Sequence, residues 1–318
     1  MKEKGDFKEN GLIFVPVSCI IINVKRFLTE ALVHEKVFYR NEGDRMNLKK
    51  KCTAAILTGL LACSALGYAA PADRETIQQV ALLQSLAQGY FGGTVTVKQL
   101  RKVGDIGIGT FKGLNGEMIV LDGKVYQALG SGEVVIADDK DTVPFSNVTF
   151  FDKDFTLPMK DIADKEALEG KLNQVVKEKG ENSFYMIKLH TTFPSILFRS
   201  EYGSEEPYPT LVGALKEKQT EFTHKDITGT VVGLYCPNYM GGLNTPGWHF
   251  HFISDDKKHG GHVLELSFQS GDVLMDKTDK FNMLLPDDKS FQTLNLAKDM
   301  KEEIRQAEQD KQPSAQKK

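Results

Sequence analysis

Four of the seven histidines of the chain lie in one short stretch, Gly247–Leu266, which reads GWHFHFISDDKKHGGHVLEL. Side chains alternate between the two faces of a β-strand, so His249 and His251 would point the same way. Residues 254–261 are turn-like, and the apolar strand that begins at His262 would return antiparallel beside the pair. Three neutral imidazole nitrogens would then converge on one point, as in sites that bind a divalent metal ion.

Three histidine ligands with an open fourth position are typical of a catalytic zinc ion, because Zn²⁺ accepts imidazole readily and structural zinc sites are usually closed by four protein ligands. Magnesium and calcium prefer oxygen ligands, so Zn²⁺ is the expected cofactor. The alternative is a solvated hairpin rim whose histidines bind nothing. His259 lies inside the turn beside lysines, and we expect it to be solvent-exposed and not a ligand.

A metal ion alone does not determine which reaction is catalysed. Two other stretches offer polar residues in strand-end or glycine-rich settings. Glu117 lies in GTFKGLNGEMIVLDG and Arg199 lies in LFRSEYGSEEPYP. Arg199 could pair bidentately with a substrate carboxylate, and Glu117 could move a proton. The alternatives are a surface arginine in a salt bridge and an ordinary hairpin glutamate.

The composition is that of a globular chain with enough apolar material for a sizeable core: 41% of residues are hydrophobic and 26% are charged. The formal charge of -3 leaves no basic excess for a phosphate backbone, and the lysines are dispersed among acids. We therefore expect no nucleic-acid partner. Only Cys236 of the four cysteines lies beyond residue 63, which excludes a disulfide framework in the body of the chain.

The segment 46–70 has the order of a signal peptide or a lipoprotein signal, with a basic stretch, an apolar run and then small residues. Cleavage near residues 67–69 competes with a lipoprotein cut before Cys63, where a lipid would be the chain's one membrane anchor. We expect an exported protein (periplasmic, cell-surface or secreted) if this leader functions, and a cytoplasmic one otherwise. Residues 1–45 would then be a wrongly assigned upstream extension, with Met46 as the start, or a disordered leader.

The body of the chain alternates short β-rich runs with a few helical patterns, which predicts an α+β fold dominated by mixed or antiparallel sheet. Asp122-Gly123 is a two-residue hairpin signal. Apolar spacing predicts four helices, at Arg74–Phe91, 164–179, 208–219 and from about Lys298.

We expect the sheets to form two packed sub-domains, with a few covering helices and the metal site in the cleft between them. The domain would span residues 73–310. Its N-terminal sheet half would cover about 73–160, and its C-terminal half, about 161–296, would carry the metal-binding strands. A polar tail would follow at 311–318.

Four stretches together resemble the acetolactate decarboxylase family, in its order and spacing from about residue 75 to 310. They are GDIGIGTFKGLNGEMIVLDGKVYQ (104–127), PFSNVTFF (144–151), RSEYGSEEPYPTL (199–211) and GLNTPGWHFHFISDDKKHGGHVLEL (242–266). The resemblance implies a lyase that converts 2-acetolactate to acetoin and CO₂ through a metal-bound enediolate, without thiamine or pyridoxal. A homodimer is a further expectation.

The resemblance also implies the site residues. It assigns the zinc ion to His249, His251 and His262, and it implies that Glu117 and Arg199 are further site residues. A glutamate from the C-terminal region also reaches the metal site in this family, and the stretch EEIRQAE points to Glu308, with Glu302 and Glu303 as neighbouring alternatives. Either Glu117 or Glu308 would protonate the enediolate.

Some residues depart from the family pattern, and two other functions stay open. Trp248 and His259 flank the ligands where the family usually has a smaller aromatic residue and a glycine. The first alternative is a cupin-like metalloenzyme, although Asp255 and Asp256 lie in a turn and not on the strand, where a cupin carboxylate would be. The second is an exported protein that binds a metal or small ligand without catalysis.

Overall fold

The computed structural model describes residues 72–308, which belong to one compact unit beginning at Pro71. The proposed leader (46–70), the upstream segment, the lipid-anchor candidate Cys63 and the polar tail (311–318) lie outside the described residues. Within residues 72–308, no helix has the length and apolar character needed to cross a membrane.

One sheet has seven strands, and its neighbours pair antiparallel except for β1 and β14, which run parallel. Strand β14 comes from the C-terminal part of the chain and forms one edge of the sheet. The strands, in spatial order, are β14 (Lys280–Leu284), β1 (Thr76–Val80), β8 (Phe145–Thr149), β3 (Ile106–Thr110), β4 (Glu117–Leu121), β5 (Lys124–Ala128) and β6 (Val134–Ile136).

The prediction of one helix at Arg74–Phe91 is wrong, because this stretch forms strand β1 and the short helix α3 (Leu83–Ala87). β1 lies between β14 and β8, so apolar residues on both of its faces are buried. A strand buried on both faces loses its period of two, and its apolar run can then match a helical pattern. Ala81, with φ of 55°, turns the chain between the two elements.

The hairpin predicted at Asp122-Gly123 is confirmed. The two residues join β4 to β5 with φ of 51° and 74°, which are the left-handed values that a tight two-residue turn requires. Glu117 is the first residue of β4 and pairs with Ala128, the last residue of β5.

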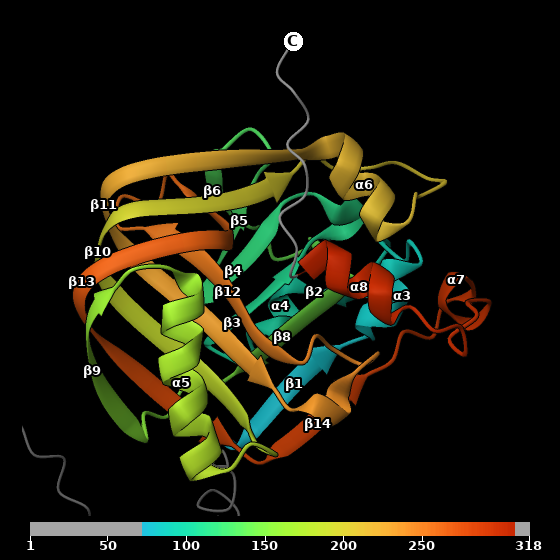
Figure 1. Ribbon diagram of the computed structural model, residues 1–318. Helices are drawn as coiled ribbons and strands as arrows, with labels where there is room; N and C mark the ends of the chain where they lie inside the picture. Colours follow the sequence, from blue (N-terminus) through green and yellow to red (C-terminus); the bar gives the residue numbers. More distant parts are fainter. Residues whose placement is uncertain (1–71, 309–318) are drawn as a thin grey trace, which may run out of the picture. The chain divides into compact units, whose positions relative to one another are not determined.

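The second sheet has five strands, and all of its pairings are antiparallel. Its long strands bend so that β10 pairs with both β11 and β13, which closes β10, β11, β12 and β13 into a ring (Figure 1). The strands are β9 (Phe155–Ile162), β10 (Phe184–Glu201), β11 (Gln219–Cys236), β12 (Gly247–Ser254) and β13 (Gly260–Thr278). A separate small pair consists of β2 (Val95–Thr96) and β7 (Thr142–Val143).

The other three predicted helices are confirmed as α5 (Lys165–Lys179), α6 (Leu211–Lys218) and α8 (Lys301–Glu308). Helix α5 packs on β9 and β13, and α3, α6 and α8 contact one another beside the sheets (Figure 1). The side chains of Asp164 and Thr210 accept hydrogen bonds from backbone amides in the first turns of α5 and α6. The remaining short helices are α4 (Val97–Leu100), α7 (Lys289–Gln292), η1 (Lys112–Leu114) and η2 (Asn238–Met240).

The described residues therefore form a mixed α+β fold of mostly strands with few helices, as predicted. One apolar core lies within the second sheet, where Phe250 and Phe252 are fully buried. Another joins the two sheets, with Ile108 and Ile119 of the first packed with Val232 and other residues of the second. The arrangement as two sub-domains around a cleft stays a prediction.

A bulge in β13 decides which residues share a face at the end of β10. Leu197 pairs with Glu265, but Phe198 pairs with Val263, so β13 carries one extra residue at this point. Directly paired residues lie on the same face of a sheet, and the extra residue reverses the alternation beyond it. As a result Arg199 pairs with His262.

Gly261 allows this close pairing, and its replacement tests the packing. A Cβ on Gly261 would lie 2.2 Å from the carbonyl oxygen of Arg199, and its φ is +154°. We expect Gly261→Ala to lower the free energy of unfolding by about 2 kcal/mol or more, measured by urea denaturation. The control Gly170→Ala, exposed within α5 with no neighbour inside 4 Å, should raise it by about 0.5–1 kcal/mol. Equal effects of the two changes would contradict this account.

Candidate active site

The three histidines predicted to converge do so in the structure. His249 Nε2 lies 3.0 Å from His251 Nε2 and 2.9 Å from His262 Nδ1, and the three ligand atoms all lie within 4.8 Å of one another. His251 pairs directly with His262 across β12 and β13, which confirms the predicted return of the strand. Phe250 and Phe252 point the other way, into the core of the second sheet.

The donor set fits a metal ion. A tetrahedral ion bound to imidazole at about 2.0–2.1 Å would place its ligand nitrogens about 3.3 Å apart, close to the spacings observed here. Without a cation, the three rings could form hydrogen bonds with one another only by sharing the few N–H protons that they carry. One cation would accept a lone pair from each ring. His249, His251 and His262 could therefore hold a metal ion.

A backbone contact fixes the orientation of His251. Its Nδ1 lies 2.8 Å from the carbonyl oxygen of Met118 on β4. A carbonyl can only accept, so Nδ1 carries the hydrogen and Nε2 keeps its lone pair for the cluster. A hydrogen bond on the opposite ring nitrogen is the usual way in which proteins orient a metal-binding histidine.

Burial keeps the cluster neutral. It lowers the pKa of His251 from 6.5 to about 4, partly offset by the Met118 carbonyl and assisted by the positive charge of Arg199. Burial is also the largest cause that holds the pKa of His249 and of His262 well below the usual range, followed by His251 for the first and Arg199 for the second. Neutral imidazoles bind a cation without first losing a proton.

Glu117 is brought to the cluster from the other sheet. Its Oε2 lies 3.4 Å from His251 Nε2, and the residue is 7% exposed. Burial raises the pKa of Glu117 well above its usual range, and the charge of Glu201 raises it further. A carboxyl group in this setting can keep a proton at a pH where an exposed glutamate has lost it.

Arg199 also faces the cluster, and its guanidinium is held at two points. Nη1 donates to Gln219 Oε1 at 2.9 Å, and Nη2 donates to the carbonyl oxygen of Ala307 in α8. Its Nε is buried and has no hydrogen-bond partner among the described residues. A guanidinium has five N–H groups, so donors remain for an anionic ligand.

The structure places Glu308, and not its two neighbours, at the cluster. Its Oε2 lies 3.6 Å from His249 Nδ1, and its side chain is 9% exposed. Burial raises the pKa of Glu308, against the opposing effect of Arg199. Glu302 instead pairs with Arg305, and Glu303 lies near Lys298.

His259 stays away from the three ligands. Its ring packs on the ring of His224 with 4.3 Å between centroids, and its backbone amide donates to Ser254 Oγ. It is half-buried, and so less exposed to solvent than expected. The ring of His224, tilted by 44° against that of His259, covers part of it.

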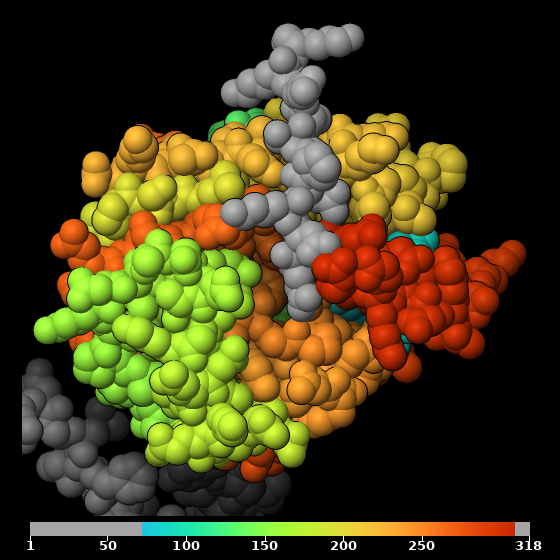
Figure 2. Space-filling view, in the orientation of Figure 1, coloured from blue at the N-terminus to red at the C-terminus, as the bar shows by residue number. Residues whose placement is uncertain are grey.

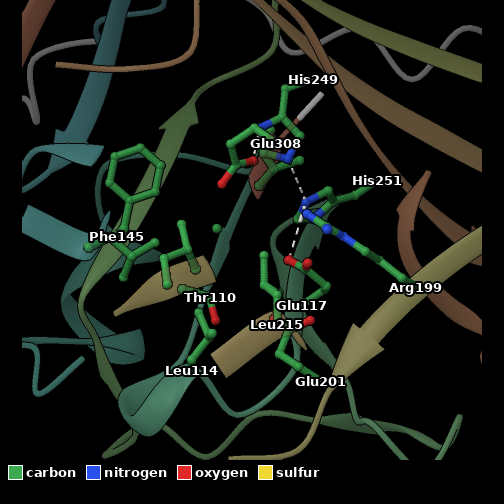
Figure 3. Close-up of a pocket in the computed structure, with 14 residues that line it drawn as sticks. Thr110, Leu114, Glu117, Phe145, Arg199, Glu201, Leu215, His249, His251 and Glu308 are labelled. Carbon is green, nitrogen blue, oxygen red and sulfur yellow. Dashed lines mark hydrogen bonds and ion pairs between the residues drawn. The ribbon is translucent and has the colours of Figure 1, made fainter. Parts of the chain in front are cut away.

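The cavity beside the cluster contains a third carboxyl, Glu201, which the sequence reasoning missed (Figure 3). Glu201 follows Arg199 by two positions on β10, so strand alternation could have placed both on one face. The cavity is otherwise largely apolar. Its lining residues are Leu86, Ile108, Gly109, Thr110, Leu114, Glu117, Phe145, Arg199, Glu201, Leu211, Leu215, His249, His251 and Glu308.

A second cavity reaches the cluster from the outside. It is lined by Lys165, Glu166 and Glu169 of α5, by residues 262–265 of β13 and by Glu308 of α8. Figure 2 shows the surface hollowed between α5, in green, and α8, in red. Glu308 lines both cavities, so it separates the inner one from this hollow.

Comparisons with known proteins point to one family. The sequence model of the family described as alpha-acetolactate decarboxylase matches residues 77–298. A relative named alpha-acetolactate decarboxylase from Methanosarcina mazei is 36% identical over 234 residues, which are 74% of this chain and 80% of the relative. One of the same name from Brevibacillus brevis is 34% identical over 241 residues, 76% of this chain and 84% of the relative.

The fold gives the same result. The crystal structure of alpha-acetolactate decarboxylase from Bacillus subtilis aligns with a TM-score of 0.71 at 31% identity, over 74% of this chain and 100% of that one. The family match covers more than half of the chain, and the relatives are matched over most of their length. This chain belongs to the alpha-acetolactate decarboxylase family of carboxy-lyases.

Proposed function

We propose that this enzyme decarboxylates 2-acetolactate to acetoin and CO₂ with a zinc ion held by His249, His251 and His262. The observation that carries the proposal is the set of three converging imidazoles beside one guanidinium and buried carboxyl groups, in a chain of this family. The choice of zinc rests on the all-nitrogen donor set, which suits Zn²⁺ far better than Mg²⁺ or Ca²⁺.

A bound zinc ion would polarise the ketone oxygen of the substrate and stabilise the enediolate left when CO₂ departs. The residues of the chain do the rest. Arg199 binds the substrate carboxylate through donors that its contacts with Gln219 and Ala307 leave free. Those two contacts also hold the guanidinium in place, so it does not have to be ordered when the substrate binds.

The proton that completes acetoin comes from a buried carboxyl group. Glu117 and Glu308 both lie within 4 Å of a cluster histidine, and burial raises the pKa of each. A carboxyl group that is protonated near neutral pH can act as a general acid. Because the donor is fixed on one side of the planar enediolate, protonation from it makes one enantiomer of acetoin in excess.

The direct test is to give racemic 2-acetolactate to the zinc-loaded protein between pH 5 and 8 and to measure acetoin by its colour reaction. We expect acetoin to form, and removal of zinc with a chelator to abolish its formation. A protein that only binds zinc would show the metal but no turnover. The absence of acetoin across this range with zinc bound would exclude the decarboxylase proposal.

Two histidine variants form a matched pair for the ligand assignment. His251→Ala should lose both zinc, measured by metal analysis, and turnover, because it removes one of three ligand nitrogens. His259→Ala should keep both, since His259 packs on His224 away from the cluster. Loss of zinc from the His259 variant alone would show that the ligands are assigned wrongly.

The lowered pKa of His251 predicts how pH affects the metal-free protein. An unfolded imidazole takes up a proton below about pH 6.5, whereas the folded one does so only near pH 4, so acid favours the unfolded state in this window. The free energy of unfolding of wild type, relative to His251→Ala, should therefore fall between pH 6.5 and 4. The slope should approach about 1.4 kcal/mol per pH unit.

The comparison with the variant is necessary because buried glutamates with raised pKa values act in the opposite direction over the same window. Their contribution is present in both proteins and largely cancels in the difference. Urea denaturation of both proteins in the presence of a chelator gives the two curves. Parallel curves would mean that His251 titrates normally in the folded protein.

A further inference from the structure

Glu201 is a buried carboxyl group that the proposed mechanism does not use. It is 1% exposed at the end of β10, and its Oε2 has no hydrogen-bond partner among the described residues. Burying a carboxyl group without full hydrogen bonding is costly, and such groups persist mainly where they serve a function. Glu201 lines the same cavity as Glu117 and Arg199.

Strand geometry aims Glu201 at this cavity. It lies two residues after Arg199 on β10, so both side chains are on the face opposite Phe198, which is buried in the core of the second sheet. Figure 3 shows Glu201 next to Glu117, on the side of Glu117 away from His249. The two carboxyl groups therefore come from different sheets and meet in one cavity.

The backbones that carry these two glutamates are joined directly. Ser200 Oγ donates to the carbonyl oxygen of Ala128 at 2.6 Å, and Ala128 is the strand partner of Glu117. Gly130 lies so close to the end of β10 that a Cβ would be 2.5 Å from the amide nitrogen of Tyr202. The end of β10 is thus fixed against the end of β5.

The chain just before Glu117 is held by the same segment. The amide of Ser204 donates to the carbonyl oxygen of Gly113 at 2.7 Å, and the amide of Gly203 donates to Asn115 Oδ1 at 3.1 Å. Contacts on both sides of Glu117 therefore fix its backbone relative to Glu201. Such a set of contacts gives the two backbone segments that carry the glutamates little freedom to move apart.

The two carboxyl groups line one cavity as neighbours, within reach of a hydrogen bond between them. Two carboxylates cannot form this bond unless one of them carries a proton, because each ionised group only accepts. Burial, opposed by the charge of Arg199, raises the pKa of Glu201 to about 7, so a proton can be kept between the pair near neutral pH.

We propose that Glu201 is a positioning residue for Glu117, whose carboxyl group it orients toward the histidine cluster through this hydrogen bond. The inference rests on the proposed function, in which Glu117 serves the protonation step. In this proposal, Glu201 and His251 orient Glu117 from opposite sides. His251 Nε2 lies 3.4 Å from Glu117 Oε2. Without Glu201, Glu117 would rotate among several conformers and hold the productive one for less time.

Glu201→Met and Glu201→Gln separate this role from a merely structural one. Glutamine has the same shape as glutamate and can donate to, or accept from, Glu117, so it preserves the hydrogen bond whichever group carries the proton. Methionine has a similar length but makes no such bond. It also adds no buried charge beside Leu114 and Leu215 in the cavity, so we expect it to fold.

The measurements are kcat, KM, zinc content and the enantiomeric composition of acetoin. For Glu201→Met we expect kcat to fall on the order of 10- to 100-fold, KM and zinc content to stay within about threefold, and the enantiomeric excess to drop. Glu201→Gln should have a kcat within about threefold of the wild-type value and the same enantiomeric excess as wild type. Glu201→Leu provides the same comparison if the methionine variant does not fold.

Two results would overturn the inference while leaving the proposed function intact. In the first, the methionine variant retains wild-type kcat and enantiomeric excess. In the second, the glutamine variant loses as much activity as the methionine variant, which would mean that the charge of Glu201 matters and the hydrogen bond does not. Wild-type protein that holds zinc but forms no acetoin would overturn both proposals.

Discussion

The candidate site depends on the pairing of three neighbouring strands, β12, β13 and β10. His251 pairs with His262, and His262 pairs with Arg199, so the two imidazoles and the guanidinium form one row across the sheet. The row exists because β13 has a bulge between its pairings with Leu197 and Phe198. Without that extra residue, Arg199 and His262 would lie on opposite faces.

Burial gives this row its chemistry. It removes water from imidazoles and carboxyl groups alike, and in each case it disfavours the charged form. The histidines stay neutral and free to bind a cation, while Glu117 and Glu308 keep protons at a higher pH than exposed glutamates do. Arg199 adds a guanidinium that faces the same cavity. The fold thus collects neutral donors and buried acids around one cation-binding point.

The sequence predicted the features that depend on local rules. Strand alternation and the Asp122-Gly123 turn follow from neighbouring residues, and so does the return of the chain that brings His262 beside His251. Glu117 and Arg199 were candidates from their glycine-rich and strand-end settings, whereas Glu308 came from the family resemblance alone. Only the resemblance assigned all three to the histidine site, since no local pattern relates residues so distant along the chain. The structure adds what depends on long-range pairing: the two-sided burial of β1 and the bulge in β13. Glu201 could have been found by alternation from Arg199, but nothing local marked it as buried.

The most direct measurement of the central claim is a crystal structure of the zinc-loaded protein with an unreactive analogue of acetolactate, with anomalous scattering recorded at the zinc edge. We expect one zinc peak about 2.0–2.1 Å from His249 Nε2, His251 Nε2 and His262 Nδ1. We also expect the carboxylate of the analogue to lie on Arg199. A zinc peak elsewhere, or an analogue whose carboxylate does not reach Arg199, would contradict the proposed site.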